Sequence, residues 1–195
     1  MQKLSVLEMN RLTVEEFQKS EKLPLVVVLD DVRSLYNVGS VFRTGDAFRV
    51  ESICLCGITA TPQPVDEAHV TMPGALERAR ECTLKAQQEI HKTALGAEDS
   101  VSWKYFHTAL DAVQYLRGQG YEVLAVEQCH DSTMLNDFHP VAGKKYAVVL
   151  GNEVKGVHQE VIDECDGCLE IPQYGTKHSL NVSTAAGIII WSFVG

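Results

Sequence analysis

The chain has no hydrophobic run long enough to cross a membrane. The C-terminal run Ala185 to Val194 is too short and too interrupted for a bilayer, whose core needs about 20 apolar residues. The stretch Met1 to Lys22 lacks the basic start and apolar run of a signal peptide, and no Pro/Ser-rich linker separates two parts of the chain. We therefore expect a cytoplasmic protein without a membrane partner. Its 195 residues, 45% of them hydrophobic, should form one domain around one core, with residues 1–22 as an extension.

Positive charge is scarce: 17 Lys and Arg oppose 26 Asp and Glu, a formal net charge of −9. This balance argues against a broad nucleic-acid footprint and gives no reason to expect DNA as a partner. The six cysteines, in a chain without a signal peptide, are expected to be free thiols. Cys165 and Cys168 have zinc-compatible spacing, but no second such pair and no His-x-x-x-His accompanies them, so we expect no metal site.

Three segments carry most of the functional information. Ile171 to Gly187 is a glycine-bearing loop that enters a helix, where free backbone N–H groups and short polar side chains can hold a ligand; an ordinary helix cap is the simpler interpretation. Leu29 to Thr44 has the pattern of strand, loop and helix, with Val38, Val41 and Phe42 on the buried stripe if the helix begins near Asn37. Leu150 to Gly156 follows an apolar strand, where open α/β sheets bind ligands.

Together these segments resemble the SpoU (TrmH-type) family of RNA 2'-O-ribose methyltransferases, of the SPOUT superfamily. The likeness extends over about residues 22–194. Two positions differ from the usual motifs, Gln173 in place of Met and Val154 in place of a frequent Gly. The positions that match are Asn37, Gly39, Arg43 and Thr44 in the first motif, Gly151, Asn152, Glu153 and Gly156 in the second, and Ile171, Pro172, Gly175 and Ser179 to Ser183 in the third.

The resemblance implies methyl transfer from S-adenosylmethionine to a ribose 2'-hydroxyl of structured RNA, tRNA or rRNA. It makes Arg43 the principal catalytic residue, as a proton acceptor or, because guanidinium is a poor base, as a stabiliser of alkoxide and phosphate. Asn37 would position Arg43 or the ribose, and Glu153 would organise its loop. Ser179 and Asn181 would fix the third loop and the acceptor.

The resemblance also implies a donor site between the second and third motif loops, which we expect to follow adjacent strands. The adenosine should contact backbone groups of Gly151, Ile171 and Leu180. Glu127 and Gln128, at the end of another strand, are donor-site candidates that could equally be solvent contacts. The remaining loop positions expected to shape the site are Asn152, Gly156 and Gly175.

RNA contacts must be local on so acidic a chain. The candidates for phosphate binding are Arg33, Arg43, Arg49, Lys155 and Lys177. The family implies a homodimer, and the helix expected at the C-terminus is apolar nearly all round, more than a surface helix needs. A few residues of that helix could be missing from the end of the sequence.

The fold class expected is α/β, a mostly parallel sheet with helices on both faces. Periodicity does not indicate a knot; the resemblance implies a deep C-terminal trefoil knot. Residues 65–86 fit the family least and are expected to be a helical insertion. The expected strands are 25–30, 52–57, 104–107, 122–127, 145–150 and 167–171, and the expected helices are 38–48, 74–92, 108–118, 157–164 and 181–194, with a short one near Phe17.

Two other classes of function stay open. The same fold could serve as a catalytically inactive RNA-binding or assembly module, because fold does not determine function. A metal-dependent hydrolase could use Asp30, Asp31 and Glu153, but no His joins these carboxylates in a recognisable sequence pattern.

Overall fold

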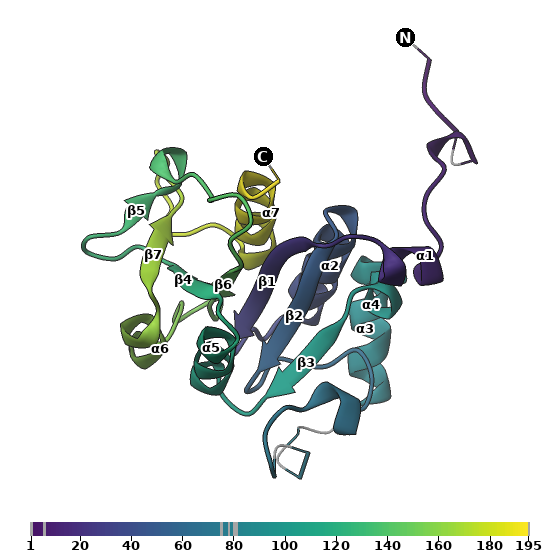
Figure 1. Ribbon diagram of the computed structural model, residues 1–195, viewed down its shortest axis with the longest axis horizontal. Helices are drawn as coiled ribbons and strands as arrows, with labels where there is room; N and C mark the ends of the chain where they lie inside the picture. Colours follow the sequence, from purple (N-terminus) through teal and green to yellow (C-terminus); the bar gives the residue numbers. More distant parts are fainter. Residues whose placement is uncertain (1, 6, 75, 78, 80–81, 195) are drawn as a thin grey trace.

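A parallel seven-stranded sheet forms the centre of the computed structural model, which describes all residues except 1, 6, 75, 78, 80, 81 and 195 (Figure 1). The strand order is β3-β2-β1-β6-β4-β7-β5, and every neighbouring pair among the described residues is parallel. The strands are β1 (Leu23–Asp30), β2 (Val50–Cys56), β3 (Trp103–Phe106), β4 (Glu122–Val126), β5 (Thr133–Met134), β6 (Tyr146–Leu150) and β7 (Gly167–Glu170).

Helices cover both faces of the sheet, as expected for parallel strands made of Val, Ile and Leu. One apolar cluster packs α2 and α7 onto one face, and a second packs α5 and α6 onto the other. In Figure 1 the N-terminal segment extends away from the sheet. The helices are α1 (Val14–Lys19), α2 (Leu35–Ala47), α3 (Leu84–Ala94), α4 (Ala97–Ser100), α5 (Ala109–Gly118), α6 (Gln159–Glu164) and α7 (Val182–Ser192).

Side-chain caps set where the helices that border the site begin. The Ser34 hydroxyl accepts the N–H of Asn37, so α2 begins at Leu35, somewhat earlier than expected. Val38, Val41 and Phe42 are fully buried, as the periodicity predicted. The Asn181 side chain accepts the N–H groups of Ser183 and Thr184 and so starts α7.

The helix expected over 74–92 is wrong at the described residues of its first part; residues 75, 78, 80 and 81 lie outside the described part of the chain. Gly74 has a left-handed φ of 74°, Thr83 caps the helix, and α3 begins only at Leu84. The insertion expected over 65–86 is, apart from the end that belongs to α3, a 3-10 turn Glu67–His69 and irregular chain among its described residues. Leu76, one of the apolar residues with approximate helical spacing in that range, is 38% exposed.

The short elements α4 and β5 were not expected, because four and two residues are too few to show a period. No described helix is long and apolar enough to span a bilayer.

Candidate functional site

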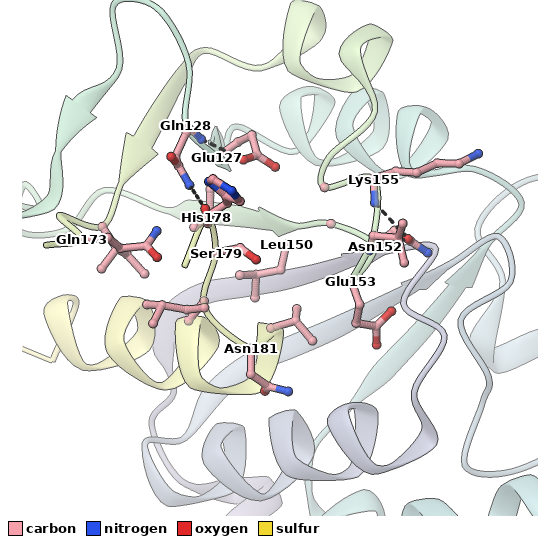
Figure 2. A pocket seen from close by; sticks show the side chains of 18 residues that line it. Glu127, Gln128, Leu150, Asn152, Glu153, Lys155, Gln173, His178, Ser179 and Asn181 are labelled. Carbon is pink, nitrogen blue, oxygen red and sulfur yellow. Dashed lines mark hydrogen bonds between the residues drawn. The ribbon is translucent and has the colours of Figure 1, made fainter. Parts of the chain in front are cut away.

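A cavity of about 570 Å³ opens at the carboxyl ends of three neighbouring strands, β6, β4 and β7 (Figure 2). Residues 150–156 after β6 form one wall, and Ile171 after β7 with residues 178–182 forms another. The sequence had suggested that the two motif loops follow adjacent strands. This expectation is wrong, because β4 lies between β6 and β7. Its end supplies Glu127 and Gln128 to the middle of the cavity wall.

The second-motif loop, residues 151–156, is held in a closed turn. Backbone hydrogen bonds run in both directions between Asn152 and Gly156. The Asn152 side chain accepts the N–H groups of Val154 and Lys155 and donates to the carbonyl of Asp31 at 2.7 Å. A Cβ on Gly151 would lie 2.0 Å from the carbonyl carbon of Gly156, so only glycine permits this close approach.

Glu127 connects β4 to this loop. One carboxylate oxygen accepts the N–H of Val157 at 3.2 Å, and the other accepts the N–H of Gln128 at 2.9 Å. Gly156 has a φ of 68°, and a Cβ there would lie 2.1 Å from Glu127 Oε2. The Gln128 side-chain amide donates to the carbonyl of His178 at 2.6 Å, which joins β4 to the third-motif loop (Figure 2).

A chain of hydrogen bonds joins all three motifs. The Glu153 carboxylate accepts the backbone N–H groups of Arg33 and Ser34, each at 3.0 Å, and the side-chain amide of Asn37 at 2.9 Å. Asn37 in turn accepts the amide of Asn181 at 3.1 Å. Residues more than a hundred positions apart are thus fixed at the start of α2 and the start of α7.

The electrostatics of Glu153 follow from these contacts. Partial burial opposes its ionisation, but the N–H groups of Arg33 and Asn37, with backbone N–H groups of Glu153 and Ser34, outweigh that effect. The pKa of Glu153 therefore lies below its ordinary value. At neutral pH the side chain is a carboxylate acceptor that organises the loop between β1 and α2.

Most of the residues expected at a donor site line this cavity. They are Gly151, Asn152, Gly156, Ile171, Leu180, Glu127 and Gln128 from the expected donor-binding set, Glu153, Ser179 and Asn181 from the expected catalytic set, and Lys155 from the expected RNA-binding set. Asn37 does not line the cavity and reaches it through Glu153 and Asn181.

Other expected site residues lie away from the cavity. Gly175 and Lys177 are exposed in the third-motif loop and are not part of the lining. Arg43 is exposed on α2, six positions beyond Asn37, which is about 9 Å along the helix axis. Arg49 follows α2 with a left-handed φ of 54°, and its carbonyl accepts the N–H of Leu23. The backbone of Arg49 thus belongs to the turn before β2, and its side chain is exposed.

Several lining residues were not expected from the sequence. His178 is exposed in the third-motif loop and also lines the cavity, and its position beside the third motif was a usable signal. Val126 and Ala185 add apolar surface to the cavity. The only signal for their part in the site was position, Val126 at the end of β4 and Ala185 on the first turn of α7. Gln173 and Val154, the two departures from the family pattern, also line the cavity.

A histidine does join two of the acidic residues. Asp30 and Asp31, at and just after the end of β1, and His158, which precedes α6, have ligand atoms within 4.8 Å of one another. Asp30 accepts the backbone N–H of His158 at 3.0 Å, and its carboxylate lies 2.9 Å from the ring Nδ1. The sequence pattern could not reveal this grouping, because β1 and β6 bring its members together across 128 positions. Glu153 is not part of it.

Curated proteins similar in sequence to this chain are named as RNA methyltransferases. The tRNA (guanosine(18)-2'-O)-methyltransferase of Escherichia coli K12 is 29% identical over 168 residues, which are 86% of this chain and 61% of that protein. A 23S rRNA (guanosine-2'-O-)-methyltransferase of Neisseria meningitidis serogroup B is 26% identical over 167 residues, 86% of this chain and 56% of that protein. The chain thus spans about three fifths of the length of these relatives.

Solved structures share the fold. An AdoMet-bound rRNA methyltransferase from Sinorhizobium meliloti superposes with a TM-score of 0.68 at 24% identity, over 90% of this chain and 60% of that one. A TrmH/SpoU tRNA modifying enzyme from A. aeolicus gives a TM-score of 0.69 at 21% identity, over 93% and 79%. The profile described as "SpoU rRNA Methylase family" matches residues 78–191, more than half of the sequence. The chain therefore belongs to the SpoU rRNA methylase family.

Proposed function

We propose that this protein transfers a methyl group from S-adenosylmethionine to a ribose 2'-hydroxyl of tRNA or rRNA. The observation that carries the proposal is the hydrogen-bonded chain from Glu153 through Asn37 to Asn181, which ties the three family motifs together beside one cavity. Two similar proteins are named as methyltransferases of tRNA and of 23S rRNA that act at a guanosine 2'-oxygen.

The cavity suits the donor in size and chemistry. Its volume of about 570 Å³ lies within the roughly 300–1,000 Å³ of small-molecule sites. Leu150, Ile171 and Leu180 offer apolar surface for an adenine ring, and Glu127 and Gln128 offer polar atoms. Backbone groups of Gly151, Ile171 and Leu180 would hold the adenosine. When bound, the sulfonium supplies an already activated methyl group.

The remaining catalytic work is alignment and removal of a proton from a weakly acidic alcohol. We assign to Glu153, Asn37 and Asn181 the positioning of α2 and of the acceptor. Ser179, in the cavity wall, would contact the acceptor. Arg43 would stabilise the developing alkoxide and the adjacent phosphate, because a guanidinium is a poor base.

A homodimer is part of the proposal. Arg43 is exposed on α2, outside the cavity of its own chain, which suits an arginine that acts at or near a subunit boundary. On α7, Ile189 and Ile190 are fully buried, whereas Trp191 is 63% and Ile188 38% exposed. An apolar helix face that its own chain leaves uncovered supports contact with a second copy.

Further expectations from the family stay proposals. We propose a single methyltransferase domain with a deep C-terminal trefoil knot, and a cytoplasmic location. The contacts of α7 with both β6 and α2 support the knot, since the chain turns back across the sheet after β7. Arg33, Lys155 and Lys177 would contact RNA phosphates.

Methyl transfer from labelled S-adenosylmethionine to separated tRNA and rRNA fractions tests the proposal, followed by mapping of the modified nucleotide. An inactive RNA-binding module would bind RNA without incorporation of label. A metal-dependent hydrolase would degrade its substrate instead. Calorimetry with S-adenosylhomocysteine should find one site per chain, and no binding at millimolar ligand by folded protein would contradict the enzyme.

A further inference from the structure

A second, smaller cavity of about 290 Å³ lies against the second-motif loop. Three residues of that loop, Asn152, Val154 and Lys155, line both cavities, so the two adjoin. Arg33 and Ile58 complete the second cavity together with Asp31 and His158. None of these last four residues lines the first cavity.

The charge inside this cavity favours an anion. Among the described residues, neither Arg33 nor Lys155 has a carboxylate within ion-pair distance. Their backbones are nevertheless fixed, because the N–H of Arg33 donates to Glu153 and the N–H of Lys155 donates to Asn152. Two exposed cationic side chains therefore extend from anchored positions on two different motif loops.

The acidic residues nearby are already engaged. Asp30 is 3% exposed, and its carboxylate accepts the backbone N–H of His158 and lies beside its Nδ1. A carboxylate only accepts hydrogen bonds, so Nδ1 is the donor in this contact, and the other ring nitrogen, Nε2, lies on the side of Asp31. Asp31 lines the cavity; one of its carboxylate oxygens accepts the N–H of Ile58, and the other lies 3.9 Å from His158 Nε2. A metal ion would have to displace the Asp30 contacts beside two cations, which disfavours a cation site.

Apolar surface accompanies the charges. Ile58 is 44% exposed and Val154 is 78% exposed, and both line the cavity. Paired cations beside apolar side chains match a nucleotide unit, whose phosphate is anionic and whose sugar and base present apolar faces. The volume is at the lower end of the range for small-molecule sites, which suits one nucleotide better than an extended ligand.

We propose that the second cavity binds one nucleotide of the substrate RNA other than the methylated one, with its phosphate between Arg33 and Lys155 and its sugar against Ile58 and Val154. This inference rests on the proposed function. The second-motif loop, which includes Glu153, separates the two cavities. An RNA strand bound in the second cavity would therefore pass over this loop to reach the first cavity. The Asp31 carboxylate would confine the phosphate to the side of the two cations.

The test is RNA affinity of Arg33→Gln at several salt concentrations, measured on a total tRNA or rRNA fraction. Arg33 lies outside the donor cavity, so affinity for S-adenosylhomocysteine serves as the folding control. We expect Arg33→Gln to weaken RNA binding by about five- to tenfold at low salt. A plot of the logarithm of the RNA association constant against the logarithm of the salt concentration should become shallower by about 0.7 to 0.9 in slope, which is the contribution of one phosphate contact. Lys85→Gln, which removes another exposed positive charge, on α3, is the control and should change neither quantity.

Ile58→Glu is a second probe, because it adds negative charge within the cavity and should weaken RNA binding at least as much. Equal effects of Arg33→Gln and Lys85→Gln on affinity and slope would overturn the proposal. Zn²⁺ binding that His158→Gln abolishes, with an unchanged RNA slope in Arg33→Gln, would assign a cation site instead. Failure of the proposed function would show differently, as wild-type protein that neither binds S-adenosylhomocysteine nor methylates RNA.

Discussion

Gly156→Ala tests the architecture of the donor cavity most directly. The substitution has two effects in this structure: it places an L residue at a φ of 68°, and it puts a Cβ 2.1 Å from Glu127 Oε2. The backbone strain costs about 1 kcal/mol. The Glu127 carboxylate must also move, which removes its hydrogen bond from the N–H of Val157.

A hydrogen bond to a charged group contributes about 1.5–3 kcal/mol when buried, and this part-buried one should contribute about 1–2 kcal/mol. The sum is about 2–3 kcal/mol. For a chain of this size each kcal/mol lowers the melting temperature by about 2–4 °C, so we expect Gly156→Ala to melt roughly 4–12 °C below wild type. Donor affinity should fall about tenfold or more, because Glu127 is displaced within the cavity.

Gly143→Ala is the matched control. Gly143 has a comparable φ of 79°, and a Cβ there would meet nothing within 4 Å. It should show the backbone strain alone, a loss of about 1 kcal/mol and roughly 2–4 °C, with unchanged donor affinity. Thermal unfolding and calorimetry with S-adenosylhomocysteine measure both quantities. Equal losses in the two variants would refute the Glu127 contact as the reason for glycine at position 156.

Three further predictions concern the proposed chemistry and assembly. Arg43→Ala should lower single-turnover methyl transfer about a hundredfold or more with donor affinity intact, and Arg43→Lys should recover little, because a point charge cannot replace the planar guanidinium; near-normal rates in both would contradict its role. Glu153→Gln leaves one N–H without an acceptor and should cost about 1 kcal/mol. The pKa of Glu153 is lower in the folded protein than in the unfolded chain, so the stability that its carboxylate contributes is fully present above the ordinary pKa, about 4.5, and is lost as the pH falls through the folded-state pKa. The loss of stability in Glu153→Gln should therefore be smaller at pH 3.5 than at pH 7 when measured by urea unfolding. Equal losses at the two pH values would argue against this role of Glu153. Trp191→Glu should convert a dimer into monomers in sedimentation, and a stable wild-type monomer at micromolar concentration would exclude that interface.

The sequence predicted the strands of the sheet better than its turns. Continuous apolar runs such as Leu25–Leu29 and Tyr146–Leu150 specify strands buried on both faces, and the structure has them in those places. The prediction of a helix before Leu84 was wrong at the described residues, because the helical spacing of Leu76 and Ala79 does not show where a helix begins; the Thr83 cap does. Strand order was also beyond the sequence, since the insertion of β4 between β6 and β7 depends on long-range pairing.

For the site, loop chemistry was more informative than composition. Gly151, Gly156 and Asn181 were singled out because they match the family motifs. The structure adds the physical reasons, which are close approaches at the two glycines and a helix cap at Asn181. The bonds of Glu153 to the start of α2 and the pairing of His158 with Asp30 could not be predicted, because nothing local in the sequence specifies contacts across more than a hundred positions.

The position of β1 in the middle of the sheet has a consequence for biosynthesis. β1 can pair with β2 soon after both leave the ribosome, but its other edge must wait for β6, whose Tyr146 pairs with Leu25. An unpaired strand edge of Val and Leu is prone to association with other chains. Asn37 likewise waits for Asn181, 144 positions later, before the ligand cavity is complete. The nascent protein should therefore bind the donor only after Asn181 has been synthesised, and the edge of β1 should be prone to association with other chains until β6 pairs with it.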